Sequence, residues 1–186
     1  ASELCAGAPA LLPTDAGPVI DREAFENIQR HLRRLDSEAT VLFGPGAAAP
    51  AADNLIPPHA YEVPAIDSVT AEIFGPVLQV VRWSGEPQAV IEAVNRLGFG
   101  LTLGIQTRID SRALALAARA HVGNVYVNRN IIGAVVGVQP FGGEGLSGTG
   151  PKAGGPHYLL RFCAEQTLTI NTTAAGGNAA LLAAIA

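Results

Sequence analysis

Apolar side chains recur with helical spacing between residues 22 and 38. The spacing is three, four and three positions for Phe25, Ile28, Leu32 and Leu35. This period predicts an amphipathic surface helix, and Asp21 immediately before it is a good N-cap. The apolar run Thr40–Phe43 that follows predicts a short strand, which ends at Gly44.

Apolar runs and helical patterns alternate between residues 77 and 128. Strands are expected at 77–83, 101–107 and 124–128, with one helix from residue 84 to Gly98 and another, capped by Asp110, to about His121. This order predicts two consecutive βαβ units with parallel strands. The first run is nearly all apolar, which is typical of a buried strand. An extended segment at 61–66 is expected at a sheet edge, because Pro64 cannot donate a ladder hydrogen bond.

These elements predict an α/β fold with a mostly parallel twisted sheet and flanking helices. Near the end of the chain, residues 158–164 favour a short helix. Residues 166–171 then alternate, with Leu168 and Ile170 on one face, as in a half-exposed strand. The Ala/Gly-rich tail from residue 172 predicts no particular element.

A glycine-rich stretch at 128–157, with no expected helix or strand, follows the last strand of this pattern. Nine glycines fall between Gly133 and Gly155. Ligands of open α/β sheets bind at the carboxyl ends of strands, and long ordered loops in compact domains are usually functional. Glycine there lets backbone approach a ligand closely. The apolar residues 138–141 favour a small-molecule wall over the alternative of a disordered linker.

Composition excludes several classes of function. The net charge is −4 and no basic run occurs, which argues against nucleic-acid and membrane-surface binding. No stretch is apolar enough to span a bilayer, and the first residues do not read as a signal peptide, so a cytoplasmic protein is expected. Hydrophobic residues make up 48% of the chain, which is enough for a core.

The spacing of residues alone gives little indication of a catalytic, cofactor-binding or metal-binding site. Residues 143–148 match GxGxxG, but no strand precedes them and no helix can start promptly after them, so a dinucleotide fingerprint is disfavoured. The four histidines lack metal-ligand spacing, so no metal site is expected. Cys5 and Cys163 are expected to be structural thiols. Glu72 could be a surface carboxylate or a ligand.

The order of short motifs resembles the aldehyde dehydrogenase superfamily over nearly the whole chain. The matching motifs are Gly17–Ile20, Glu72–Val77, Phe99–Leu101, Gly123–Asn128, Pro140–Gly143, Ser147–Gly148 and Glu165–Ile170. Within it, the segments Ile105–Asp110, Asn128–Asn130, Gly133–Pro156 and Ala174–Leu182 are similar to the L-glutamate γ-semialdehyde (Δ1-pyrroline-5-carboxylate) dehydrogenase module of bacterial bifunctional proline utilization A proteins.

The resemblance implies NAD-dependent oxidation of the semialdehyde to glutamate in proline catabolism. Glu72 matches the family glutamate that holds the nicotinamide ribose hydroxyls, and Phe74 matches a residue that packs near that ribose. Gly133 and Ala134 match the loop whose N–H groups anchor the substrate carboxylate, and Phe141 matches an aromatic residue against the substrate stem. Residues 166–171 match the strand that pairs across a homodimer.

The departures from the family are equally informative. The nucleophilic cysteine stands in a Gly-Gln-x-Cys context that this sequence lacks, so no catalytic residue is assigned. We expect residues 1–164 to be the C-terminal part of a catalytic domain and 165–186 an oligomerisation strand and tail. The partners expected for this chain are the aldehyde substrate, a second copy of the chain and the rest of the same enzyme. The isolated chain should form no NADH.

Two other functions compete with this interpretation. One is a noncatalytic aldehyde-dehydrogenase-like structural or oligomerisation domain, but such domains usually lose the anchor loop, and residues 133–156 are intact here. The other is a free-standing nucleotide-binding module built on the GxGxxG match, which calorimetry with NAD would exclude if no binding were seen.

Overall fold

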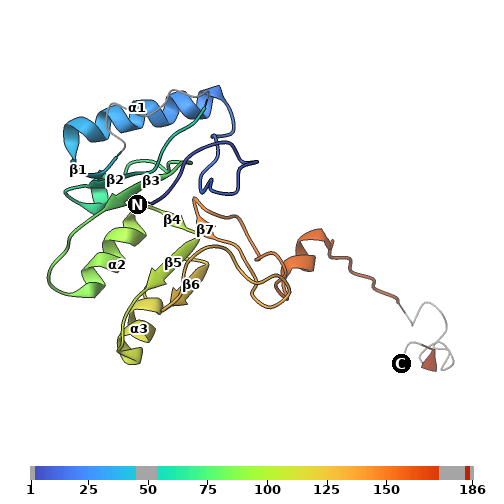
Figure 1. Cartoon of the computed structure of the whole chain (residues 1–186). Coiled ribbons are helices and arrows are strands. Elements are labelled where there is room, and N and C mark those ends of the chain that lie inside the picture. Colours follow the sequence, from blue (N-terminus) through green and yellow to red (C-terminus); the bar gives the residue numbers. More distant parts are fainter. Residues whose placement is uncertain (1–2, 45–53, 172–182, 185–186) are drawn as a thin grey trace. The chain divides into compact units, whose positions relative to one another are not determined.

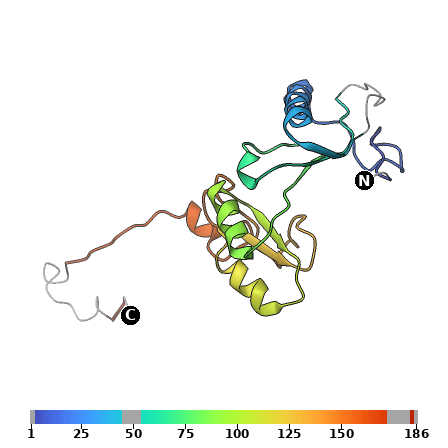
Figure 2. The same cartoon turned by 90° about the vertical axis from the view of Figure 1, so that its left-hand side faces the viewer.

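The structure is a computed structural model that describes residues 3–44, 54–171 and 183–184 (Figures 1 and 2). The described residues group into two compact units. Unit 1 takes those of ranges 1–133 and 142–150, and unit 2 takes those of 134–141 and 151–186. Each unit is described by itself below.

The first helix of unit 1, α1 (Arg22–Glu38), has the predicted position and cap. The Asp21 carboxylate accepts a hydrogen bond of 2.8 Å from the N–H of Ala24, which satisfies one of the free donors at the helix start. Ile28, Leu32 and Leu35 are buried, which confirms the apolar face. The chain then enters β1 (Thr40–Phe43), also as predicted.

Strand β1 belongs to a three-stranded sheet with β2 (His59–Glu62) and β3 (Val77–Val80), in the order β1-β2-β3. β1 is antiparallel and β3 parallel to β2. The edge position expected for 61–66 is therefore wrong, because β2 is the central strand. Pro64 lies beyond the end of β2, so its missing N–H costs no ladder hydrogen bond.

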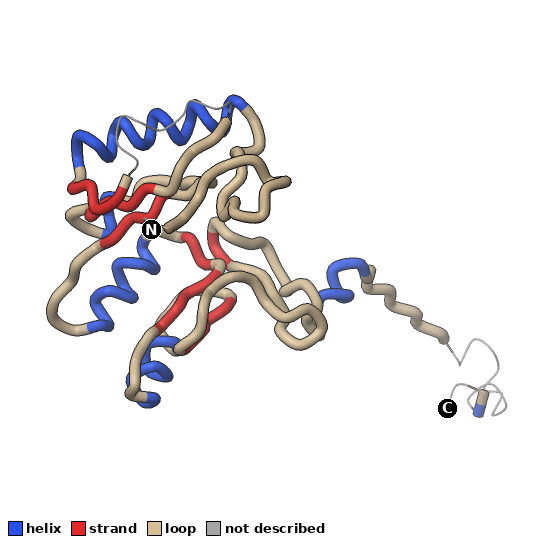
Figure 3. The backbone as a smooth tube through the Cα atoms, in the orientation of Figure 1, coloured by secondary structure: helices blue, strands red, loops and turns tan. Residues whose placement is uncertain are grey.

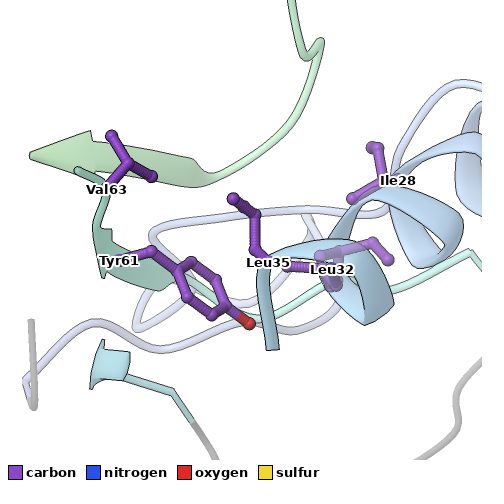
Figure 4. Packing of buried hydrophobic residues seen from close by; sticks show 6 residues of the cluster. Ile28, Leu32, Leu35, Tyr61 and Val63 are labelled. Carbon is purple, nitrogen blue, oxygen red and sulfur yellow. The ribbon is translucent and has the colours of Figure 1, made fainter. Parts of the chain in front are cut away.

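The core of this part lies between α1 and the sheet (Figure 4). Its buried side chains are Ile28, Leu32, Leu35, Ile56, Tyr61 and Val63. Tyr61 is 1% exposed, and its hydroxyl donates a hydrogen bond of 2.7 Å to Asp36 on α1. Burial of the phenol and the adjacent Asp36 carboxylate raise the pKa of Tyr61 above its usual range, so the phenol remains a donor.

Replacing Tyr61 by phenylalanine is expected to lower the free energy of unfolding by about 1 kcal/mol, because the hydroxyl and its partner lose their hydrogen bond. Urea unfolding at pH 7 would measure the loss. Tyr158→Phe is the control, since no described residue bonds to that hydroxyl. Because the folded-state pKa of Tyr61 lies above the unfolded value near 10, stability should fall with rising pH in the wild type from about pH 10. The variant should lack that part of the decline.

The rest of unit 1 contains a confirmed βαβ unit. After the 3₁₀ turn η2 (Ile66–Ser68) and β3 come α2 (Pro87–Arg96) and β4 (Phe99–Gly100). Then follow β5 (Thr102–Ile105), α3 (Asp110–Ala117) and β6 (Asn124–Val127), with β5 and β6 parallel. A second buried cluster consists of Ile91, Ile105, Ala113 and Leu116.

Three details of the predicted 77–128 region are wrong. β3 pairs with β2, and no described pairing joins it to β5, so the strands form small separate sheets (Figure 3). Leu78 in β3 is 60% exposed, so this strand is not fully buried. Asp110 is the first residue of α3, whose N-cap is Ile109 without a side-chain hydrogen bond.

The sequence predicted no strand in the glycine-rich stretch at 128–157, but the part of it in unit 1 contains one. β7 (Glu144–Gly145) pairs with β4 in antiparallel orientation. A Cβ on Gly143 would lie 2.7 Å from the Ser147 carbonyl oxygen and 2.8 Å from that of Gly100. Glycine at this position therefore permits close backbone-to-backbone packing.

Unit 2 contains the 3₁₀ helix η3 (Tyr158–Phe162), which replaces the short α-helix expected at 158–164. Phe141 and Ala153 pair through two backbone hydrogen bonds of 3.0 and 2.9 Å. Residues 163–171 form neither helix nor strand, so the strand expected at 166–171 does not form within one chain. The Ala174–Leu182 motif lies outside the described residues. In the described part of the chain, no helix is long and apolar enough to cross a membrane.

Candidate functional site

A hollow of about 370 Å³ lies between α1 and the turn that precedes β3. Ala24, Asn27, Ile28 and His31 line it from α1, and Ala71, Glu72, Ile73 and Phe74 line it from the turn. The structure thus brings together Glu72 and Phe74, the two residues that family resemblance marks for the cofactor. Because both walls belong to unit 1, the hollow is formed within one compact unit.

The turn is held against α1 by a glycine. A Cβ on Gly75 would lie 2.6 Å from the Cδ1 atom of Ile28, so a side chain there would push the turn away from the helix. The Gly75 N–H donates to the Ile73 carbonyl at 3.0 Å, and the Val77 N–H donates to that of Gly75 at 2.8 Å. The turn therefore leads directly from the wall of the hollow into β3.

Side chains alternate along this turn between core and solvent. Ile73 packs against the core below α1, whereas Glu72 is exposed and Phe74 is 79% exposed. No described residue forms a hydrogen bond or an ion pair with the Glu72 carboxylate. A carboxylate that is free of protein partners can accept hydrogen bonds from two adjacent hydroxyls of a ligand.

The helix wall contributes two polar residues that the sequence did not single out, Asn27 and His31. They are four positions apart and border the apolar stripe of α1, which is the signal that could have found them. Partial burial lowers the pKa of His31, and the adjacent Arg34 guanidinium lowers it further, while Glu38 opposes both effects. The neutral imidazole is thereby favoured, and among the described residues that line the hollow Glu72 alone is acidic.

Gly133, expected at the substrate anchor, lies near the end of β6. Asn128 directly follows this strand with φ of 55°, and its side-chain amide forms two hydrogen bonds with the backbone of Thr107, at 3.0 and 2.9 Å. The Tyr126 hydroxyl donates a 2.9 Å hydrogen bond to the Gly133 carbonyl. Gly133 itself has φ of 60° and open space where a side chain would lie, so its conformation suits glycine.

Ala134 and Phe141, the other two expected substrate residues, belong to unit 2. Between them the backbone turns back on itself, with the Gln139 N–H donating to the Val135 carbonyl at 2.9 Å. The Gln139 side chain closes the turn by accepting from the Val135 N–H at 3.0 Å. Phe141 then pairs with Ala153, so its backbone position is fixed within unit 2.

The comparison with family models places these residues in a known context. A model described as "Aldehyde dehydrogenase family" matches residues 1–168. The chain belongs to this family. Its fold agrees, because a crystal structure of bifunctional proline utilization A protein superposes with a TM-score of 0.83 at 54% identity, covering 94% of this chain and 18% of that one.

Two kinds of aldehyde dehydrogenase relative are similar to the chain. "Bifunctional protein PutA" of Klebsiella aerogenes is 48% identical over 172 residues, which are 89% of this chain and 13% of the relative. "1-Pyrroline-5-carboxylate dehydrogenase" of Geobacillus kaustophilus is 35% identical over 169 residues, 90% of this chain and 32% of the relative. The chain therefore spans only a minor part of each.

A Thermus 1-pyrroline-5-carboxylate dehydrogenase solved with bound NAD is also similar, with a TM-score of 0.77 and 35% identity. That match covers 87% of this chain and 31% of the Thermus chain. It associates this part of the aldehyde dehydrogenase fold with an NAD-binding relative.

The GxGxxG match does not form a dinucleotide fingerprint. The strand there, β7, contains only two residues and lies inside the match, and residues 146–157 contain no helix. Both conditions of the fingerprint are thus unmet. Cys5 and Cys163 are free and exposed, and no described group of His, Cys, Asp and Glu residues could hold a metal ion.

Proposed function

We propose that this chain is the C-terminal portion of an NAD-dependent L-glutamate γ-semialdehyde dehydrogenase, which oxidises the semialdehyde to glutamate in proline catabolism. The observation that carries the proposal is the hollow of α1, where Glu72 and Phe74 lie together on the same turn. Both PutA and 1-pyrroline-5-carboxylate dehydrogenase relatives match most of the chain, which supports the substrate class.

The residues of the hollow fit the nicotinamide riboside half of NAD. Its volume of about 370 Å³ suits a group of that size, and the Glu72 carboxylate, with which no described residue pairs, can accept hydrogen bonds from both ribose hydroxyls. Phe74 presents an exposed aromatic face for packing against the ribose or nicotinamide. Asn27 offers one further donor, its side-chain NH₂ group, while its side-chain oxygen accepts a hydrogen bond from Arg30. Bound NAD would supply the acceptor for hydride from the aldehyde carbon.

Substrate binding is proposed for the loop that leaves β6. The N–H groups of Gly133 and Ala134 would bind the substrate carboxylate, because exposed backbone amides can hold an anion without a cationic side chain. Phe141 would pack against the aliphatic stem. The nucleophile is not assigned to any residue of this chain, and we propose that the remaining part of the same enzyme supplies it.

Dimerisation is proposed for residues 166–171. Leu168 is 81% exposed and Ile170 is also exposed, at alternate positions of a segment of unit 2 that forms neither helix nor strand. Such a segment can gain backbone hydrogen bonds and bury its apolar face by pairing with a strand of a second copy.

The function can be tested in a chimera in which this chain replaces the matching region of the Klebsiella aerogenes PutA. We expect the chimera to form NADH from the semialdehyde, and the isolated chain to form none. A folded chimera without NADH formation would contradict the proposal and favour the noncatalytic structural domain. NADH formation by the pure isolated chain would contradict the proposed division of the active site.

In the same chimera, Glu72→Gln is expected to raise the KM for NAD about tenfold, because an amide accepts ribose hydroxyls less strongly than a carboxylate does. Steady-state kinetics with varied NAD would measure this change. The matched control is Glu92→Gln on α2, whose exposed carboxylate lies 3.6 Å from Arg119 and does not line the hollow. Equal KM values for the two variants would remove Glu72 from the cofactor site.

A further inference from the structure

The loop that leads from β6 to Gly133 is tied to the end of β5. Two hydrogen bonds join the Asn128 side chain to the backbone of Thr107. The Gln106 side chain donates a further hydrogen bond, at 3.0 Å, to the Arg129 carbonyl. The first part of the loop is therefore fixed by side chains that bond to backbone groups on both sides.

Tyr126 on β6 ties down the far end of the same loop. Its side chain is 6% exposed, and its hydroxyl donates a hydrogen bond of 2.9 Å to the Gly133 carbonyl. The Arg129 guanidinium lies over the Tyr126 ring, 4.4 Å from the ring centroid, in a cation–π contact. Burial and this contact hold the ring in place, so the hydroxyl is a fixed donor rather than a mobile one.

The Gly133 carbonyl and the N–H of Ala134 belong to one peptide group. This peptide bond is trans, and in a planar trans peptide the C=O and N–H bonds point in opposite directions. Because the Tyr126 hydroxyl holds the carbonyl, covalent geometry alone aims the Ala134 N–H away from that hydroxyl. No described residue accepts a hydrogen bond from the Ala134 N–H.

The surroundings of this peptide group favour a bound anion. Gly133 is exposed, and no atom of the described residues lies within 4 Å of the position that a Cβ would take there. A ligand can therefore approach the backbone closely. Hydrogen bonds in a chain polarise one another, so the bond from Tyr126 to the carbonyl strengthens the N–H of the same peptide as a donor.

We propose that Tyr126 is a positioning residue for the substrate carboxylate. It would act through the Gly133 carbonyl, by directing the Ala134 N–H at the carboxylate, rather than by touching the substrate. The inference rests on the proposed function, in which the backbone amides of Gly133 and Ala134 bind that carboxylate. It predicts that the Tyr126 hydroxyl serves only aldehydes that carry a carboxylate.

Tyr126→Phe in the chimera with Klebsiella aerogenes PutA would test this selectivity, because phenylalanine keeps the buried ring and removes only the hydroxyl. The two substrates compared are the semialdehyde and pentanal, which has the same number of carbon atoms but no carboxylate. We expect kcat/KM for the semialdehyde to fall about tenfold, the usual effect of losing one hydrogen bond that supports a charged contact. The value for pentanal should be unchanged.

A binding measurement and two controls accompany the kinetics. The inhibition constant of L-glutamate, which retains the carboxylate of the semialdehyde, should rise by a similar factor, and this readout does not depend on the chemical step. The KM for NAD should stay the same, because Tyr126 does not line the cofactor hollow. Tyr158→Phe is the matched control, since no described residue bonds to that hydroxyl, and it should leave both aldehydes unaffected.

Several results would overturn the inference. Equal losses for the two aldehydes, a raised KM for NAD or a variant that does not fold would assign the hydroxyl to the fold rather than to the carboxylate. Unchanged kcat/KM for the semialdehyde would show that the Gly133 carbonyl needs no such tether. A folded wild-type chimera that forms no NADH would instead remove the proposed function and the inference with it, so the two kinds of failure are distinguishable.

Discussion

Gly123→Ala is expected to lower the free energy of unfolding by about 3 kcal/mol, because the added methyl group would enter space already filled by backbone. Gly123 precedes β6, and a Cβ there would overlap the Gly142 carbonyl oxygen and lie 2.7 Å from its carbon. It would also lie 2.9 Å from the Cα of Gly143. Neither segment can yield by a rotamer change, so the 142–150 segment must shift.

Thermal or urea unfolding of the purified chain would measure this loss. Gly44→Ala is the matched control, since among the described residues its Cβ would meet only side-chain atoms, the edge of the His59 ring at 3.3 Å and the Val41 Cγ1 atom at 3.9 Å. A side-chain ring can move by a few tenths of an ångström, so the control should change stability by less than about 1 kcal/mol. Similar losses in both variants would show that the contact between Gly123 and Gly142 is not tight.

Leu35→Ala is expected to lower the free energy of unfolding by about 3 kcal/mol, which is within the usual range for truncating a buried leucine. Leu35 is 1% exposed and lies at the centre of the cluster under α1 (Figure 4). Its removal leaves a cavity between the helix and Tyr61 that the surrounding side chains can only partly fill. The loss should appear in the same unfolding experiments.

Leu114→Ala provides the comparison, because it makes the same chemical change on a helix where the side chain is 71% exposed. Its effect should stay within about 0.5 kcal/mol, the usual range for surface positions. A loss at Leu114 as large as that at Leu35 would mean that Leu114 is buried in solution. That result would contradict the exposed surface of α3.

Local patterns predicted much of the secondary structure. The three–four–three spacing of α1 and the Asp21 cap both hold, because helix formation and capping depend on residues within one or two turns. The β5–α3–β6 unit holds for a similar reason, since a short crossover allows only one sense of pairing. The family could also be recognised from the order of short motifs in the sequence.

The pairing partners of the strands were harder to predict from the sequence. Pro64 suggested an edge, yet β2 is central because it pairs with β1, which precedes it in the sequence, on one side and with β3, which follows it, on the other. The pairing of β4 with β7 joins residues more than forty positions apart, which no local pattern reveals. Gly143 and Gly145, two glycines of this stretch, permit this close backbone contact.

The sequence by itself determined α1, α2 and α3, most of the strands and, through resemblance, the roles expected of Glu72, Phe74, Gly133 and Phe141. Only the tertiary structure decided that Glu72 and Phe74 share a hollow with Asn27 and His31, and that β3 and β5 belong to different sheets among the described strands. The physical reason is range: periodicity and capping act over a few residues, whereas a pocket wall or a strand pair requires segments that lie far apart along the chain.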